Sequence, residues 1–351
     1  MPIRVLVVDD SAFMRSILTR MIHSDPELKV VGIARDGEDA LVQIKALHPD
    51  VVTLDIEMPK LDGLGCLARV MAEQPLPVLM VSYLAAQGAE PTLRALELGA
   101  VDFVTKSTPD DRHNLETLQK DLILKIKAAA LIGPAKLQAQ ESAPRLAPPV
   151  QSRLMHVKAN PAVEVVAIGS STGGPKTLHR LLPLFPADFP SAVMVAQHMP
   201  KGFTRPFAQR LDEYCSLRVV EIENGIPIQP GMIYIAPAGY QTRVVRRQEQ
   251  LVAEVFEQAG QIYKPCVDLL FHSLAAACQG RVLAAILTGM GADGSAGMKA
   301  LRELGARTIA EAEESCVIFG MPRAAIENGA AEFVELLPDI FPRLMKIIDG
   351  K

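Results

Sequence analysis

Five residues in the first third of the chain could form one charged site, because each follows a short apolar run. They are Asp9, Asp10, Asp55, Ser82 and Lys106. In an open α/β sheet, ligands bind at the carboxyl ends of the strands, so we expect these side chains to converge. Taken singly, each is better explained as a solvated loop or capping residue, and it is their shared position that favours a site.

The three carboxylates of this group would repel one another unless a cation neutralised them. A hard, oxygen-seeking Mg²⁺ suits such a donor set. With the metal screening the charge, one carboxylate can act as a nucleophile toward phosphorus and carry an acyl phosphate. Lys106 and the Ser82 hydroxyl could then bind the new phosphoryl oxygens. The sequence therefore predicts a magnesium-dependent phosphoacceptor.

A serine, a histidine and an aspartate follow apolar runs in the second half of the chain. Ser171 is the central residue of a G-x-S-x-G pattern that runs from Gly169 to Gly173. That spacing places a hydroxyl on a sharp turn near the N–H groups of a helix start, which can stabilise an oxyanion. A serine becomes nucleophilic when a base takes its proton and an acid orients that base. We therefore predict acyl transfer with Ser171 as nucleophile, His198 as base and Asp293 as its orienting partner.

Two phosphate-binding interpretations of the serine turn do not fit its residues. A Walker loop needs lysine after its last glycine, but Gly174 is followed by Pro175. A dinucleotide-binding loop needs glycine two positions after Gly169, where Ser171 stands. A plain Gly/Ser turn stays possible on the pattern alone, and the joint presence of the histidine and the aspartate favours catalysis. The order Ser–His–Asp also differs from the Ser–Asp–His of α/β-hydrolases.

These residues depend on strands that are read from short apolar runs alternating with helical periodicity. In the first third we expect strands at Val5–Val8, Val30–Ile33, Val51–Leu54, Val78–Val81 and Phe103–Val104. Between them we expect helices such as Ala12–Ile22, Gly37–Leu47 and Pro91–Leu98. Later strand candidates are Val163–Ile168, Ala192–Ala196 and Val282–Leu287. The fold class predicted is α/β, with a flavodoxin-like five-stranded parallel sheet first and a doubly wound, mostly parallel α/β domain second.

The predicted domains are residues 1–125 and 159–351, joined by a linker over residues 126–158. The linker is rich in Ala and Gln, shows no strand pattern and contains Pro134, Pro144, Pro148 and Pro149. Such a connection keeps the first domain at a high effective concentration near the second, where a weak contact can block a site efficiently.

Composition narrows the class of protein. The 351 residues are 49% hydrophobic and 22% charged with a net charge of −4, so nothing favours disorder or binding to nucleic acid. Apolar runs fall short of the roughly 18 residues that a membrane span needs, so we expect no membrane insertion. The N-terminus lacks the pattern of a signal peptide, and the five cysteines show neither C-x-x-C nor zinc spacing. We expect a cytoplasmic protein.

Three segments of the first domain resemble response-regulator receiver domains, and the similarity covers about residues 3–125. They are Val5–Ser11, Asp55–Gly63 and Thr105–Lys106. The resemblance implies that Asp55 accepts phosphate from a histidine kinase, with Asp9 and Asp10 helping Asp55 to hold Mg²⁺. It also implies that Ser82 and Phe103 are the switch hydroxyl and switch aromatic, although Phe103 by itself reads as a core residue.

Five segments of the second domain resemble the catalytic domain of the CheB methylesterase family, over about residues 160–348. They are Ile168–Pro175, Gln197–Met199, Tyr234–Pro237, Leu287–Gly294 and Phe319–Ala325. The resemblance implies a protein-glutamate methylesterase and glutamine deamidase that acts on the cytoplasmic helices of methyl-accepting chemoreceptors, without a cofactor in this domain. Ser171, His198 and Asp293 match its triad, and Thr172 and Met290 its oxyanion region. It further implies that the receiver blocks the esterase until Asp55 is phosphorylated.

The chain departs from the family pattern at three places. Gln241 stands where histidine is common, Glu311–Ala312 where Gln-Asp is common, and Cys266 where serine is frequent. The alternatives left open are a receiver-controlled hydrolase of a different ester or amide, and a non-catalytic receptor-binding regulator. A transcription factor is disfavoured because we find no basic recognition helix.

Overall fold

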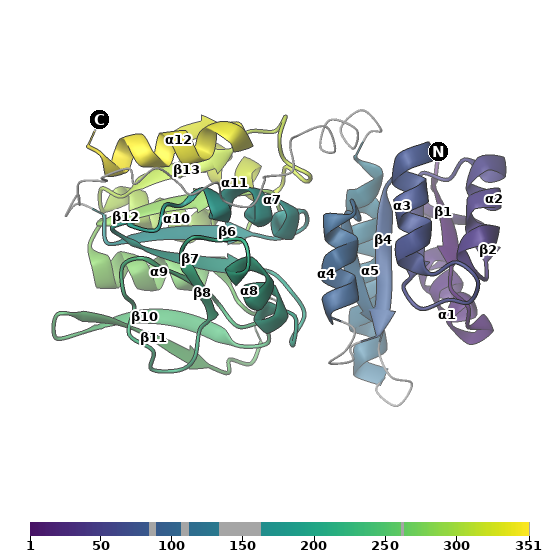
Figure 1. Ribbon diagram of the computed structural model, residues 1–351, viewed down its shortest axis with the longest axis horizontal. Helices are drawn as coiled ribbons and strands as arrows, with labels where there is room; N and C mark the ends of the chain where they lie inside the picture. Colours follow the sequence, from purple (N-terminus) through teal and green to yellow (C-terminus); the bar gives the residue numbers. More distant parts are fainter. Residues whose placement is uncertain (84–88, 107–111, 133–162, 261–262, 351) are drawn as a thin grey trace. The chain divides into compact units, whose positions relative to one another are not determined.

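The computed structural model describes residues 1–83, 89–106, 112–132, 163–260 and 263–350. It divides into two compact units, Met1–Arg145 and Leu146–Lys351, each built around its own sheet (Figure 1). The division falls inside the predicted linker. The first residues of the predicted linker belong to the end of a helix that runs to Ala130. Residues 133–158 of the predicted linker lie outside the described ranges.

The first unit is a five-stranded parallel sheet with the order β2-β1-β3-β4-β5. Its strands are β1 (Ile3–Val8), β2 (Leu28–Ala34), β3 (Val51–Asp55), β4 (Val78–Tyr83) and β5 (Asp102–Lys106). The order is that of flavodoxin-like folds, as predicted from the sequence. Because helices cover both faces, the strands read as nearly continuous apolar runs, and all of β3 is buried.

Helices lie on both faces of this sheet. They are α1 (Ala12–His23), α2 (Gly37–Leu47), α3 (Gly63–Glu73), α4 (Ala89–Glu97) and α5 (Arg112–Ala130). Helix α1 contacts α5, whereas α3 contacts α2 and α4, so these two groups occupy opposite faces. The side chains of Ser11, Asp36 and Asp62 cap the N-termini of α1, α2 and α3. These caps order the loops that follow the strands, where the predicted phosphoacceptor lies.

The second unit contains a seven-stranded sheet with the order β14-β13-β12-β6-β7-β9-β8, and every pairing in it is parallel. Its strands are β6 (Val165–Ser170), β7 (Ala192–Gln197), β8 (Arg218–Glu221), β9 (Met232–Ile235), β12 (Val282–Ile286), β13 (Arg307–Glu311) and β14 (Phe333–Glu335). An antiparallel hairpin, β10 (Gln241–Arg247) with β11 (Gln250–Phe256), stands apart from this sheet and packs against helix α9. The predicted doubly wound, mostly parallel architecture is confirmed.

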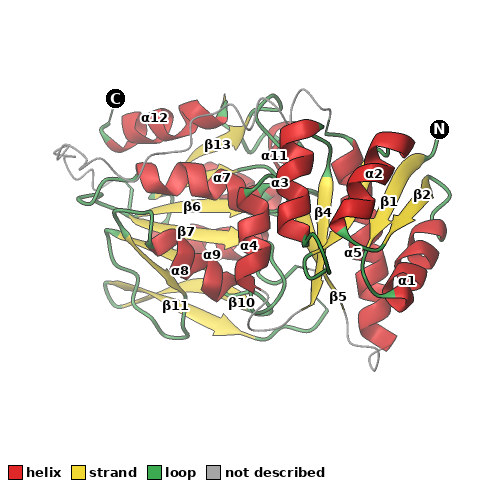
Figure 2. Ribbon diagram, turned by 45° about the vertical axis from the view of Figure 1, so that its right-hand side comes forward, coloured by secondary structure: helices red, strands yellow, loops and turns green. Residues whose placement is uncertain are grey.

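Strand order reverses at β6, which lies between β7 and β12. Strands β6 and β7 lie side by side in Figure 2. The helices of this unit are α7 (Gly174–Leu181), α8 (Thr204–Asp212), α9 (Val267–Cys278), α10 (Ser295–Glu303), α11 (Met321–Glu327) and α12 (Leu337–Ile348), with the short 3₁₀ helix η1 (Leu182–Leu184). Right-handed crossovers in the two directions put α7 and α10 on opposite faces. The loops after β12, β6 and β7 consequently leave the sheet side by side, and a crevice of this kind is where open α/β sheets bind ligands.

Helix α9 is the centre of the second unit's core. Leu270, Phe271 and Leu274 are fully buried between the sheet and the β10–β11 hairpin. A helix enclosed in this way is apolar nearly all round, as its sequence is. None of the helices within the described ranges combines the length and apolar character that crossing a membrane requires.

Replacing Leu274 with alanine should destabilise the second unit by about 2–5 kcal/mol, because it leaves a cavity around α9. Leu304, which is 52% exposed, supplies a matched control whose replacement by alanine should change stability by about 0.5 kcal/mol or less. Calorimetric unfolding of the full chain measures both. Equal shifts for the two variants would contradict the packing described for α9.

Candidate functional site

The three residues predicted for acyl transfer lie at the ends of three adjacent strands. Ser171 follows β6, His198 follows β7, and Asp293 lies in the loop after β12. The backbone ties these loops together, because the His198 N–H donates to the Ser170 carbonyl at 3.0 Å and the Ser171 N–H to the Thr288 carbonyl at 3.0 Å. The structure thus brings the predicted residues to one edge of the sheet.

His198 and Asp293 form a close, largely buried pair. Nε2 of His198 lies 2.7 Å from Oδ2 of Asp293, and the two side chains are only 9% and 4% exposed. Since Nε2 faces a carboxylate, it carries the ring proton, a tautomer assigned from the hydrogen-bond pattern. Nδ1 is buried and has no hydrogen-bond partner among the residues that the structure describes. The imidazole therefore presents an unused acceptor, which is what a general base needs.

Asp293 is held by the N-terminus of helix α9. Its carboxylate accepts the N–H of Val267 at 2.7 Å and that of Asp268 at 3.0 Å, and the Cys266 thiol donates to it at 3.2 Å. Burial alone would raise the pKa of Asp293. The hydrogen bond from His198, its charge when the ring is protonated, and the two helix N–H groups outweigh burial and lower the pKa to about 2. Asp293 is therefore ionised at neutral pH.

Asp268 performs the reciprocal task for the next helix. From the first turn of α9, its Oδ1 accepts the N–H of Gly297, in the first turn of α10, at 2.7 Å. Asp293, in the loop before α10, thus accepts N–H groups at the start of α9. Asp268, in α9, accepts an N–H group at the start of α10. Negative charge is favoured at both helix N-termini. Sequence reasoning missed Asp268, although an acidic residue in a first helical turn was a usable signal.

Two neighbouring serines at the end of β6 have different environments. Ser170 is fully buried and donates through Oγ to Oε1 of Gln197 at 2.6 Å, whereas Ser171 is half-buried. The Gln197 amide group in turn donates to the carbonyls of Ser171 at 2.9 Å and His198 at 3.0 Å. Gln197 therefore clamps the serine loop to the histidine loop, and Ser170 is a structural partner rather than a nucleophile. Sequence reasoning did not assign Gln197 this role.

Glycines allow the serine turn to pack this closely. Gly173 has φ +80°, in the left-handed region that favours glycine. A Cβ at Gly174 would lie 2.0 Å from Oε1 of Gln197, and one at Gly169 would lie 2.4 Å from Cγ1 of Val267. These contacts give a physical reason for the glycine positions that the sequence pattern singled out.

The predicted oxyanion region is assembled around Thr288 and Gly289. The Thr288 hydroxyl donates to the Thr172 carbonyl at 3.0 Å, and a Cβ at Gly289 would lie 2.9 Å from Cβ of Ser171. Met290 follows at once, so its loop lies against the serine turn. The oxyanion roles of Thr172 and Met290 stay a prediction.

The residues at which the chain departs from the family pattern make hydrogen bonds in or near this site. Gln241 is fully buried and bridges two backbone groups, donating to the Tyr263 carbonyl at 2.7 Å and accepting the Cys266 N–H at 2.9 Å. Glu311, also fully buried, accepts the Thr288 N–H at 2.8 Å and so supports the oxyanion loop. Burial, with Asp293 nearby, raises the pKa of the Cys266 thiol to about 12, so the thiol stays a neutral donor.

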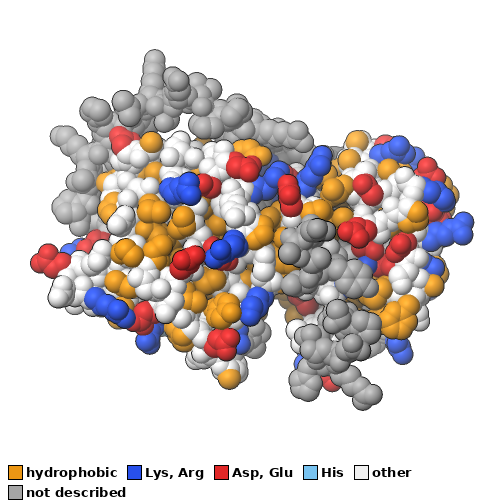
Figure 3. Space-filling model, turned by 60° about the horizontal axis from the view of Figure 1, so that its bottom comes forward, with side chains coloured by type: hydrophobic (Ala, Val, Ile, Leu, Met, Phe, Trp, Pro, Cys, Tyr) orange, Lys and Arg blue, Asp and Glu red, His pale blue; other side chains and the backbone are white. Residues whose placement is uncertain are grey.

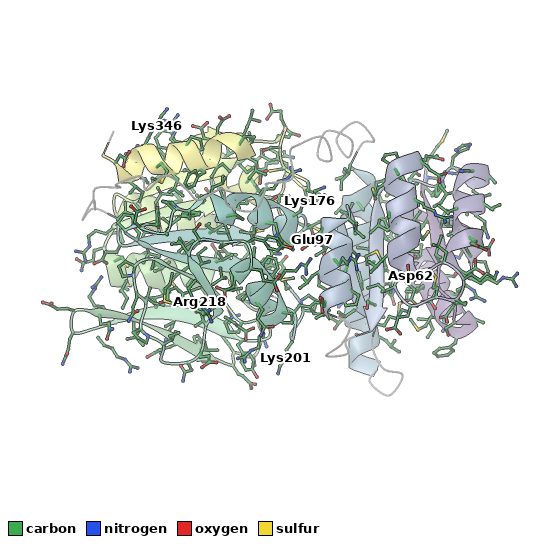
Figure 4. All side chains as sticks on the ribbon, in the orientation of Figure 1. Asp62, Glu97, Lys176, Lys201, Arg218 and Lys346 are labelled. Carbon is green, nitrogen blue, oxygen red and sulfur yellow. The ribbon has the colours of Figure 1, made fainter. Side chains whose placement is uncertain are left out.

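One basic side chain lies close to His198 in the sequence. Lys201, labelled in Figure 4, follows His198 by three residues, and its ammonium group lies 4.8 Å from the centre of the Tyr240 ring. On the face of the molecule shown in Figure 3, acidic and basic side chains are interspersed among apolar groups.

The acidic residues of the first unit also converge. Carboxylate oxygens of Asp9, Asp10 and Asp55 lie within 4.8 Å of one another. Nζ of Lys106 lies 2.8 Å from Asp9 and 2.6 Å from Asp55. Burial raises the pKa of Asp55 to about 6, although the charge and hydrogen bond of Lys106 oppose the rise. Three clustered carboxylates, with Asp10 exposed, suit a hard divalent cation, so the donor set fits Mg²⁺.

The residues predicted as switch groups lie on the two strands beside this cluster. Ser82 is on β4 and is 6% exposed, and Phe103 is on β5 and is 2% exposed. The strands pair so that Ser82 lies opposite Thr105, next to Lys106. The structure places Ser82 near the carboxyl end of β4, as predicted, and Phe103 near the start of β5. The switching role of both residues stays a prediction.

Comparisons with known proteins agree with both units. A family model described as CheB methylesterase matches residues 166–344, and one described as response regulator receiver domain matches residues 5–117. A protein-glutamate methylesterase/protein-glutamine glutaminase of Symbiobacterium thermophilum is 46% identical over 96% of this chain and 94% of its own length. The protein of the same name from Geobacillus kaustophilus is 44% identical over 99% of both chains. The crystal structure of the Thermotoga maritima CheB methylesterase catalytic domain is 37% identical, with a TM-score of 0.51, and covers 53% of this chain and 98% of its own.

A small fluorophosphonate should label Ser171, because its phosphorus accepts attack by a serine that a base has activated. Labelling, read by peptide mass mapping, should disappear in Ser171→Ala. It should persist in Ser170→Ala, because Ser170 is fully buried. Label found on Ser170 would overturn the choice of nucleophile.

Asp55→Asn should stabilise the first unit more at pH 7 than at pH 4 in metal-free buffer. The folded pKa of Asp55, about 6, exceeds the ordinary 3.8, so as pH rises the unfolded chain loses this proton first and the native state loses stability. Asparagine cannot ionise, so its advantage should grow to as much as about 3 kcal/mol by pH 7. Denaturant unfolding at the two pH values measures it, and an equal advantage at both would contradict the pKa.

Proposed function

The chain belongs to the CheB methylesterase family, with a receiver domain ahead of the esterase, and on that premise we propose that Ser171, His198 and Asp293 carry its activity. The protein is a phosphorylation-regulated protein-glutamate methylesterase and protein-glutamine glutaminase. The observation that supports this catalytic set best is the buried His198–Asp293 pair, whose Nδ1 is left as a proton acceptor at the edge where the Ser171 turn ends.

The reaction is acyl transfer. His198 Nδ1 takes the hydroxyl proton of Ser171 while Oγ attacks the carbonyl carbon of a glutamate methyl ester. The tetrahedral intermediate collapses when the imidazolium returns the proton to the leaving methoxide, and methanol departs. Water, activated by the same imidazole, then cleaves the acyl-serine and releases the glutamate carboxylate. A glutamine amide follows the same path and releases ammonia.

Two charges that develop during the reaction are stabilised, one on the imidazolium and one on the oxygen of the intermediate. The ionised Asp293 stabilises the imidazolium that forms in each proton transfer. The negative oxygen of the intermediate meets backbone N–H groups of the turn before α7 and of the loop at Met290, with Thr172 on the same turn. The catalytic unit performs this chemistry with its own side chains and backbone.

The receiver unit supplies the regulation. Asp9, Asp10 and Asp55 would hold Mg²⁺, which would supply positive charge to screen the carboxylates and the incoming phosphoryl group. Asp55 then accepts phosphate from a histidine kinase. Lys106, which pairs with Asp9 and Asp55, is placed to contact the phosphoryl oxygens. Ser82 and Phe103 respond to the new charge, and the receiver's restraint on the esterase is relieved.

The substrate and setting follow from the same proposal. The ester or amide is carried by a cytoplasmic helix of a methyl-accepting chemoreceptor, and the kinase belongs to the same chemotaxis pathway. A cytoplasmic location is supported by the five free cysteines, since structural disulfides are rare there.

Methanol release from methylated receptor fragments should rise when a small phosphodonor and Mg²⁺ are added. It should vanish in Ser171→Ala, and Asp293→Asn should lower turnover by up to ~10⁴, by analogy with serine proteases. Asp55→Asn should abolish the rise caused by the phosphodonor. Hydrolysis of small esters without any methanol release from receptor fragments would favour a hydrolase with a different substrate.

A further inference from the structure

One face of the His198 imidazole is covered by an aromatic ring. The ring of Tyr263 stacks on it with a centroid separation of 4.3 Å and an interplanar angle of 4°. The Tyr263 hydroxyl reaches to within 3.1 Å of where a Cβ of Gly291 would be, so the ring spans from His198 to the loop after Met290. Tyr263 is still 37% exposed, so part of it also borders the site.

The stack supplies a restraint that the Asp293 hydrogen bond lacks. A single bond at Nε2 fixes one edge of the imidazole but lets the ring plane tilt about that bond. A flat aromatic neighbour opposes such a tilt because it would lose contact area on one side and overlap on the other. Since proton transfer depends on alignment of the reacting atoms, the tilt of this ring matters for the reaction.

Tyr263 is itself held in place by Gln241. The buried Gln241 amide ties the Tyr263 carbonyl and the Cys266 N–H, so both ends of the segment 263–266 are fixed to one side chain. Gln241 is the first residue of β10, whose hairpin with β11 packs on α9. Cys266 immediately precedes the N–H groups that hold Asp293. One amide therefore fixes the segment that carries Tyr263 beside His198.

We propose that Tyr263 and Gln241 form a brace that sets the plane of the His198 imidazole for proton exchange with Ser171. Both are positioning residues: Tyr263 acts through His198, and Gln241 acts through Tyr263. The inference rests on the proposed function, because it takes His198 as the general base. It assigns a role to Gln241, a residue at which this chain departs from the family pattern.

Tyr263→Ala should slow the phosphonylation of Ser171 by a small fluorophosphonate about 10–100-fold, because a small misplacement of a catalytic group costs that much. With methylated receptor fragments, kcat should fall similarly while KM stays near the parent value. Tyr263→Phe keeps the ring and should restore both rates. Tyr214→Ala is the matched control, since Tyr214 is 38% exposed and packs edge-on against another histidine, His179; it should change neither rate.

A spectroscopic signature tests the stack directly. The ring protons of His198 should resonate upfield in the parent and in Tyr263→Phe because of the aromatic ring current, and should move downfield in Tyr263→Ala. Tyr263→Leu, which fills the space without a ring, should behave like Tyr263→Ala in both the spectrum and the phosphonylation rate. Gln241→Leu should lower the rate in the parent but add little in the Tyr263→Ala background, since the two residues act in series.

Several results would overturn the brace. A raised KM in Tyr263→Ala with an unchanged phosphonylation rate would make Tyr263 a substrate contact instead. Additive effects of Gln241→Leu and Tyr263→Ala would separate the two residues. Failure of the proposed function gives a different result. If the parent is phosphonylated at Ser171 but releases no methanol, the proposed substrate is wrong, and the phosphonylation rates still test the brace.

Discussion

The catalytic unit depends on one interaction, the binding of the Asp293 carboxylate at the N-terminus of α9. Two helix N–H groups, the Cys266 thiol and His198 converge on this single group. A carboxylate so deeply buried would otherwise be neutral, and these donors instead hold its pKa at about 2. Because the charge is retained, the histidine keeps the tautomer that leaves Nδ1 without a hydrogen-bond partner among the described residues. Asp268 in turn accepts the Gly297 N–H in the first turn of α10, so hydrogen bonds link the N-termini of α9 and α10.

The two units treat a buried carboxylate at a strand end in opposite ways. Asp293 receives several neutral donors and a histidine, and it stays ionised. Asp55 receives the Ile56 N–H and the Lys106 ammonium group, and burial nevertheless raises its pKa to about 6. A divalent cation would stabilise the ionised form of such a carboxylate, and a carboxylate that accepts phosphate needs that stabilisation. The same topological rule, polar groups at the carboxyl ends of parallel strands, thus positions both carboxylates, for which we propose an orienting role and a phosphate-accepting role.

Much of this arrangement could be predicted from the sequence. Apolar runs located the strands that carry both sites to within about two residues, and the first predicted helices nearly coincide with α1 and α2. The position of Ser171, His198 and Asp293 after such runs was enough to bring them to one edge. Two supports around them were not predictable, because the Gln197 clamp and the Tyr263 stack join residues distant in the chain and leave no periodic signal. Asp268 did offer a signal, as an acidic residue in a first helical turn. Gln241 was visible only as a departure, and its meaning came from its two backbone contacts.

The most direct test of the central claim is to trap the covalent intermediate. The full chain, mixed with methylated receptor fragment, phosphodonor and Mg²⁺, is quenched in acid during steady turnover, and its peptides are mapped by mass spectrometry. The account predicts a receptor glutamyl group esterified to Ser171, absent from Ser171→Ala and from samples given unmethylated, unamidated fragment. An adduct on Ser170 or another side chain during the same methanol release would contradict it.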